Sequence, residues 1–125
     1  MLRNFDKKRI FYLFMTLLIA IVIFYASTIE ATAGKSLGVN LATIYHFGIF
    51  FMLTFFLSLT ITNKKISNKT ILITLLISLT YALSDEFHQL FVPGRFASLK
   101  DILIDGIGSL CAVLSIKQIN KFNKL

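Results

Sequence analysis

Four of the six acidic residues in this sequence lie within or beside strongly apolar stretches. Asp85 and Glu86 are adjacent near the end of one stretch. Asp101 and Asp105 lie one helical turn apart near the start of another. A charged side chain at the centre of a membrane-spanning helix costs about 2.5 kcal/mol or more, so such residues are functional candidates. Carboxylates placed in this way could transfer protons, bind a divalent cation or pair with a positive side chain.

Other polar side chains accompany these carboxylates. His88 and Gln89 follow Asp85 by about one helical turn. Arg95 lies in the next connection, and His46 is near the start of a separate apolar stretch. An arginine guanidinium suits phosphate or carboxylate, because its planar fork donates two parallel hydrogen bonds. The candidate functional cluster comprises His46, Asp85, Glu86, His88, Gln89, Arg95, Asp101 and Asp105. A purely structural network of ion pairs is the alternative interpretation.

A divalent metal ion is one ligand that such residues could hold. Carboxylates and imidazoles together favour a hard or borderline ion. The candidate ligands are Asp85, Glu86, His88, Asp101 and Asp105. Glu86 and His88 are too close in sequence to match the zinc-protease motif on a helix. The sequence therefore identifies no firm metal site and requires no cofactor, and a bound divalent metal stays an open alternative.

The elements that must position these residues are membrane-spanning helices. Apolar residues make up 56% of the chain and charged residues 15%, against about 45–50% and 25% in soluble domains. Apolar stretches of about the length needed for a span occupy residues 10–29, 41–62, 70–92 and 101–116. The last is short for a hydrocarbon core of about 30 Å. We predict an all-α integral membrane four-helix bundle, with residues 1–125 forming a single domain.

The net charge of +7 is a signal of membrane topology. Basic residues precede the first stretch, separate the second from the third and follow the fourth, whereas only Lys35, Arg95 and Lys100 lie in the other two connections. The positive-inside rule then predicts that both termini are cytoplasmic and that the candidate cluster faces outward. The basic ends favour anionic membrane lipid, and we expect no nucleic acid as a partner.

A cleaved signal peptide is an alternative for the first stretch. The basic start, the apolar stretch and the small residues of Ala31–Ala33 resemble a secretory signal with its cleavage site. The apolar stretch is longer than the usual 7–15 residues, which favours an intact span.

Helical periodicity gathers polar and small residues on two faces. At about 100° per residue, Ser78 shares a face with Asp85, and Gly108 shares a face with Asp105. Small residues allow helices to approach closely in membranes. We predict that these two faces pack on each other in an antiparallel hairpin closed by residues 93–100, with both aspartates toward the bundle interior.

Two segments carry a resemblance to a known family. Ser84–Arg95 reads SDEFHQLFVPGR and Asp101–Gly108 reads DILIDGIG, and both resemble the signature of the VanZ-like family. His46 and Phe47 resemble the histidine–phenylalanine pair that opens the second span of that family. The sequence has Asp105 where asparagine is commoner in the family. The resemblance implies a multi-pass protein of the bacterial cell membrane, in a family named for low-level resistance to the glycopeptide teicoplanin.

Two classes of function fit these residues. In the first, a crevice with Arg95 at its mouth binds an amphiphile at the outer leaflet, such as a lipoglycopeptide or a lipid-linked cell-wall precursor. The acidic residues would then pair with Arg95 or bind sugar and amide groups. The alternative is a metal-assisted hydrolase or transferase acting on a lipid-linked envelope substrate, with Glu86 as general base. The sequence determines neither the ligand nor the oligomeric state, nor whether any reaction is catalysed or resistance conferred.

Overall fold

The computed structural model describes residues 7–29, 39–62 and 65–122, and four α-helices account for most of them. The helices are α1 (Lys7–Thr28), α2 (Val39–Ile61), α3 (Asn68–Gln89) and α4 (Leu99–Phe122). No β-strand occurs in these described ranges. Each helix is long and apolar enough to cross a membrane. The predicted all-α architecture with four candidate membrane-spanning helices is confirmed, and the predicted spans 10–29 and 41–62 agree with α1 and α2 apart from their ends.

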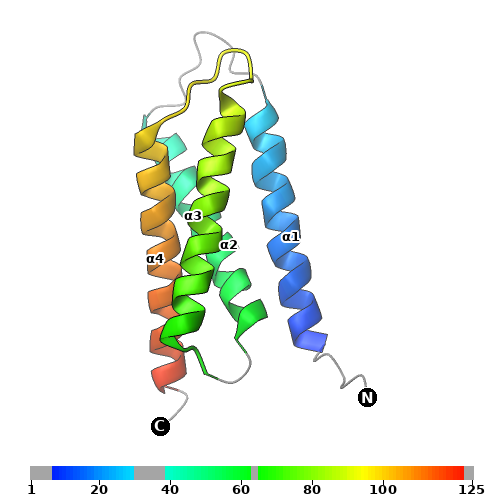
Figure 1. Ribbon diagram of the computed structural model, residues 1–125, viewed down its shortest axis with the longest axis vertical. Coiled ribbons are helices and arrows are strands. Elements are labelled where there is room, and N and C mark those ends of the chain that lie inside the picture. The colour runs from blue at the N-terminus through cyan, green and yellow to red at the C-terminus, as the bar shows by residue number, and fades with distance from the viewer. Residues whose placement is uncertain (1–6, 30–38, 63–64, 123–125) are drawn as a thin grey trace.

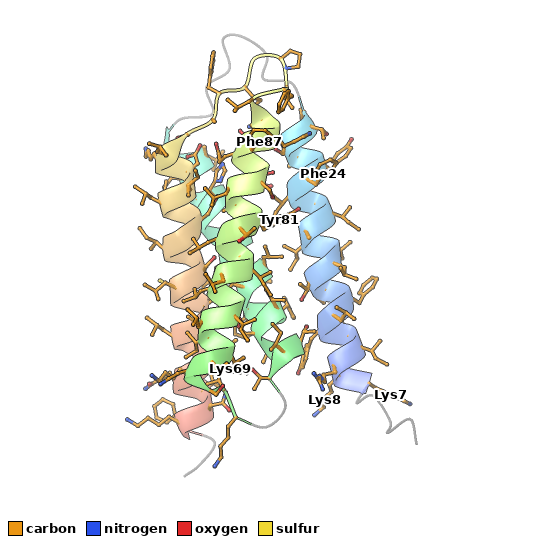
Figure 2. The ribbon with its side chains drawn as sticks, viewed as in Figure 1. Lys7, Lys8, Phe24, Lys69, Tyr81 and Phe87 are labelled. Carbon is orange, nitrogen blue, oxygen red and sulfur yellow. The ribbon has the colours of Figure 1, made fainter. Side chains whose placement is uncertain are left out.

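The helices pack side by side with α2 at the centre. In Figure 1, α1 and α4 lie on opposite sides of the bundle and α3 lies in front of α2. α2 packs against all three other helices, and most extensively against α4. The start of α1 and the end of α4 lie at one end of the bundle, where Figure 2 also shows Lys7, Lys8 and Lys69. The α3–α4 connection lies at the opposite end.

α4 is longer than the predicted span of residues 101–116. It has 24 residues, enough for roughly 36 Å, so it is not too short to cross the bilayer. Its N-terminus begins earlier because the Ser98 hydroxyl accepts a hydrogen bond from the Asp101 N–H at 3.3 Å, which is typical of a helix cap. Its C-terminus continues because Lys117 and Lys121 can extend their charged groups toward water. The count of consecutive apolar residues therefore predicted neither end of α4 correctly.

α3 begins two residues before the predicted span of residues 70–92 and ends three residues before the end of that span. It runs from Asn68 to Gln89. Pro93 disfavours a helical backbone at Val92, the residue before it. Gly94 has a φ of 75°, which a glycine adopts without the strain that a side chain would cause. The chain therefore leaves the helix early and turns across the end of the bundle.

The small-residue face of α4 packs on α2, which corrects the predicted packing of that face on α3. A Cβ atom on Gly108 would lie 2.5 Å from the backbone carbonyl oxygen of Phe47. A Cβ on Gly106 would instead lie 3.3 Å from the side chain of Leu79 on α3. Residues 106 and 108 point in different directions around α4, and periodicity alone could not tell which neighbour each would meet. Asp85 and Asp105 are nevertheless both buried, as predicted.

The bundle is apolar outside and partly polar inside. Large apolar side chains such as Ile21, Leu72 and Leu103 are exposed on the helix surfaces. This pattern is expected where lipid, and not water, surrounds the helices.

The possible signal-cleavage segment Ala31–Ala33 lies outside the described residues, as does Lys35.

Three buried hydroxyl groups form a polar layer near the middle of the bundle. The Thr54 hydroxyl on α2 lies 2.8 Å from the Ser78 hydroxyl on α3 and 2.8 Å from the Ser109 hydroxyl on α4. We refer to these three residues as the hydroxyl layer. Hydrogen bonds between side chains commonly join neighbouring helices in membranes. Each hydroxyl of the layer has a partner, so the layer is a complete interhelical contact.

Candidate functional site

A second polar group lies nearer the end of the bundle that carries the α3–α4 connection. It comprises His46 from α2, Glu86 from α3, and Asp101 and Asp105 from the first two turns of α4. We call these residues the imidazole–carboxylate cluster. His46 Nδ1 lies 2.9 Å from Asp105 Oδ1, and His46 Nε2 lies 3.9 Å from Asp101 Oδ2. Both ring nitrogens of His46 therefore face carboxylates, which lie one turn apart on α4.

Glu86 links this cluster to the start of α4. Its Oε2 atom accepts a hydrogen bond of 2.7 Å from the backbone N–H of Ser98, the capping residue of α4. The Glu86 side chain is therefore held in place at one oxygen. One ligand atom each from His46, Glu86 and Asp101 can be chosen so that all three lie within 4.8 Å of one another. These three residues could together hold a metal ion.

Two carboxylate oxygens of this cluster are buried without a hydrogen-bond partner. Glu86 and Asp105 are only 2% and 0% exposed, and neither Glu86 Oε1 nor Asp105 Oδ2 has a partner. Thr62 Oγ1 is the other such buried side-chain atom within the described residues. Buried polar groups in folded proteins are usually satisfied, so each exception requires an explanation. A hydroxyl can be left unsatisfied at a modest cost, whereas a buried ionised carboxylate costs much more.

A cavity of about 420 Å³ lies next to this cluster, between the ends of α1, α2 and α3. Its walls are mainly apolar, and its polar lining comes from Ser27, Tyr45, His46, Asp85, Gln89 and Arg95. Gln89 Nε2 donates a hydrogen bond of 3.2 Å to Asp85 Oδ2. His46 belongs to both the cavity wall and the imidazole–carboxylate cluster. The cavity thus combines an apolar interior with a small set of polar groups, as ligand sites commonly do.

Arg95 is positioned over the C-terminal end of α1. Its Nε donates to the Ile29 carbonyl at 3.1 Å, and one terminal nitrogen donates to the Ala26 carbonyl at 3.1 Å. The last carbonyl groups of a helix lack partners within the helix and carry partial negative charge, so a guanidinium is favourable there. In the part of the chain that is described, Arg95 therefore bonds to the α1 backbone and not to the acidic side chains that we expected as partners.

His88 lies apart from the imidazole–carboxylate cluster. Its ring packs 4.8 Å from that of Phe24, measured between centroids, and its Nδ1 lies 3.5 Å from the Ser27 hydroxyl. Both contacts are to α1. Residues 86 and 88 differ by about 200° around a helix, so the two side chains face different neighbours.

The predicted cluster therefore divides into two groups, with His88 outside both. His46, Glu86, Asp101 and Asp105 come together between α2, α3 and α4, whereas Asp85, Gln89 and Arg95 line the cavity with His46. Of the candidate metal ligands, Asp85, His88 and Asp105 are not in the converging set, and His46 takes a place there instead.

Sequence reasoning missed three contributors to the site. Ser27 and Tyr45 line the cavity, and Ser98 supplies the backbone N–H that holds Glu86. Ser98 could have been found, because a serine three residues before Asp101 matches a common helix-capping pattern. Tyr45 gave no such signal, since an aromatic residue in an apolar span is usually part of the packing.

The fold and the site define a multi-pass membrane protein with an ionisable cluster buried at one end of its helices. The sequence matches the family model described as VanZ/LLP1 over residues 10–120. The chain belongs to this family, as the motifs in residues 84–108 indicated. No curated protein and no solved structure matches it.

Proposed function

We propose that this VanZ-family membrane protein binds an amphiphile in the cavity between α1, α2 and α3. The observation that carries the proposal is the cavity itself, whose walls are mainly apolar and whose polar lining includes Asp85, Gln89 and Arg95. Its volume of about 420 Å³ is within the usual range for small-molecule sites, about 300–1,000 Å³. A segment of an acyl or prenyl chain would fit against Ile49 and Phe50.

The polar lining of the cavity suits the head of such a molecule. The Arg95 guanidinium can bind a phosphate or carboxylate group through donors that the α1 carbonyls do not use. Asp85 and Gln89 offer acceptors and donors for sugar hydroxyls or amides. These groups fit the two ligand classes expected from the sequence, namely a lipoglycopeptide such as teicoplanin and a lipid-linked cell-wall precursor.

The charge distribution supports a position at the outer face of the bacterial plasma membrane. Lys7, Lys8 and Lys69 lie at the end of the bundle opposite the cavity (Figure 2). With these residues in the cytoplasm, as the positive-inside rule favours, both termini are cytoplasmic and the cavity faces the outer leaflet. Both ligand classes occur on that side of the membrane. Binding there could withdraw the antibiotic from its target or protect the precursor, and so lower susceptibility to teicoplanin.

A cavity-filling variant tests the proposal. Ala42 lines the cavity, so Ala42→Phe should obstruct it. Ile44 is two residues away, is 66% exposed and does not line the cavity, so Ile44→Phe is the matched control. Binding of teicoplanin and of farnesyl pyrophosphate to the protein in nanodiscs would be measured by calorimetry. At least one probe should bind the wild type and the control, and should bind Ala42→Phe much more weakly. Equal binding by the two variants, or no binding by the wild type, would contradict the proposal.

A further inference from the structure

We infer that His46, Glu86 and Asp101 form a binding site for a divalent transition-metal ion, Zn²⁺ or Mn²⁺, with Asp105 orienting the histidine. The residues come from three different helices and converge beside the cavity, so an ion there would tie α2, α3 and α4 together. His46 also lines the cavity, but Glu86 and Asp101 do not, so variants of these two carboxylates test metal binding separately from amphiphile binding.

The first argument is the orientation of His46. Its Nδ1 lies 2.9 Å from Asp105 Oδ1, so in a neutral ring beside an ionised Asp105 the proton is on Nδ1, which donates a hydrogen bond to the carboxylate. The other nitrogen, Nε2, then has a free lone pair and lies on the side of Asp101. Metal-binding histidines almost always donate their second ring N–H to a carboxylate, a carbonyl or water in this way. Asp105 is fully buried, so its position is fixed by the packing of α4 on α2.

The second argument is the unpartnered oxygen of Glu86. The Ser98 N–H fixes Oε2, and Oε1 is buried without any hydrogen-bond partner. Buried carboxylate oxygens are normally paired, so this unpaired atom requires an explanation. A divalent metal ion would supply the missing partner and would also offset most of the negative charge that three carboxylates place around a single imidazole.

The spacing of the three ligand atoms fits a small divalent ion after a modest closure. Bonds from Zn²⁺ to nitrogen or oxygen ligands are about 2.0–2.2 Å, so two ligands of a tetrahedral site lie about 3.3–3.6 Å apart. His46 Nε2 and Asp101 Oδ2 are 3.9 Å apart, and the full set lies within 4.8 Å. One imidazole and two carboxylates are a donor set for borderline and harder ions. Three protein ligands leave a coordination position open, as in sites that bind a further ligand.

Metal analysis of two neighbouring carboxylate variants tests the inference. Glu86→Gln removes a proposed ligand, whereas Asp85→Asn removes the adjacent buried carboxylate, which is outside the converging set. Each purified protein would be stripped with a chelator, reloaded separately with Zn²⁺ and Mn²⁺, desalted and analysed by mass spectrometry of the metals. The wild type and Asp85→Asn should retain an equimolar amount of one of the two ions, and Glu86→Gln should retain only a trace.

Size-exclusion chromatography and circular dichroism would establish that the variants are folded. Asp101→Asn gives a second ligand variant at a partly exposed position, and it should also lose the ion. If the wild type takes up neither ion, or if both ligand variants retain it as well as Asp85→Asn does, the inference is wrong. The cluster would then be a set of carboxyl groups that share protons.

Discussion

The hydroxyl layer and the imidazole–carboxylate cluster are built from the same three helices but differ in how completely their polar atoms are satisfied. Thr54, Ser78 and Ser109 bond to one another and are almost completely buried. The cluster is equally buried at Glu86 and Asp105, yet each of these side chains has an oxygen without a partner. The layer is complete in the protein alone. The cluster has buried oxygens that the protein alone leaves unpaired, which is why we propose a metal ion at Glu86.

The largest expected effect is a loss of stability at the contact between α2 and α4, on which both the hydroxyl layer and the imidazole–carboxylate cluster depend. Gly108→Ala should strongly destabilise the bundle, because its Cβ would be 2.5 Å from the Phe47 carbonyl oxygen and backbone cannot move aside as a side chain can. Overpacking of this kind costs about 1–3 kcal/mol or more. Gly106→Ala is the control, since it meets only the flexible end of Leu79. Thermal unfolding in detergent would measure both, and equal tolerance at the two glycines would contradict the packing of α4 on α2.

The next effect would distinguish the two regions by metal affinity. Asp105→Asn keeps an acceptor for His46 but removes the charge, so affinity for the ion should fall by about 10–100-fold, as for other residues that orient metal ligands. Ser109→Ala, one turn further along α4, belongs to the hydroxyl layer and should leave metal affinity unchanged. Titration with Zn²⁺ and Mn²⁺ would measure both. Similar losses in the two variants would mean that metal affinity reports only the general packing of α4.

The smallest effect belongs to the hydroxyl layer. Thr54→Val keeps the shape of the side chain and removes the hydroxyl shared by Ser78 and Ser109. Interhelical hydrogen bonds in membranes contribute about 0.6 kcal/mol on average, and about 1.7 kcal/mol at most. The variant should therefore show slightly lower thermal stability and unchanged metal content. Loss of the metal in Thr54→Val would contradict our inference that only the imidazole–carboxylate cluster determines metal binding.

The sequence predicted the helices well and the partners of each side chain less well. Spans of apolar residues are a strong signal because the lipid core requires helices of a certain length. Burial of Asp85 and Asp105 was also predictable, because charged residues in such spans face the bundle interior. The contact of Gly108 with α2 could not be predicted, because helical periodicity defines a face of α4 but not the helix that packs on that face.

The division of the candidate cluster depended on the same kind of information. Glu86 and His88 are close in the sequence, but the helix directs one toward α4 and the other toward α1. His46 is distant in the sequence from the carboxylates, and only the packing of α2 against α4 brings it to Asp105. The bonds of Arg95 to α1 likewise follow from the turn at Gly94, whose effect on direction no motif specifies.

The most direct test of the central claim is a structure of the protein in lipid after reloading with Zn²⁺ or Mn²⁺, with anomalous scattering recorded at the absorption edge of the metal. The account predicts an anomalous peak bonded to His46 Nε2 and to carboxylate oxygens of Glu86 and Asp101, at about 2.0–2.2 Å. His46 Nδ1 should still bond to Asp105, and the hydroxyl layer should show no peak. A structure without an anomalous peak at the cluster, in which Glu86 Oε1 and Asp105 Oδ2 instead bond to each other or to neighbouring side chains, would contradict it.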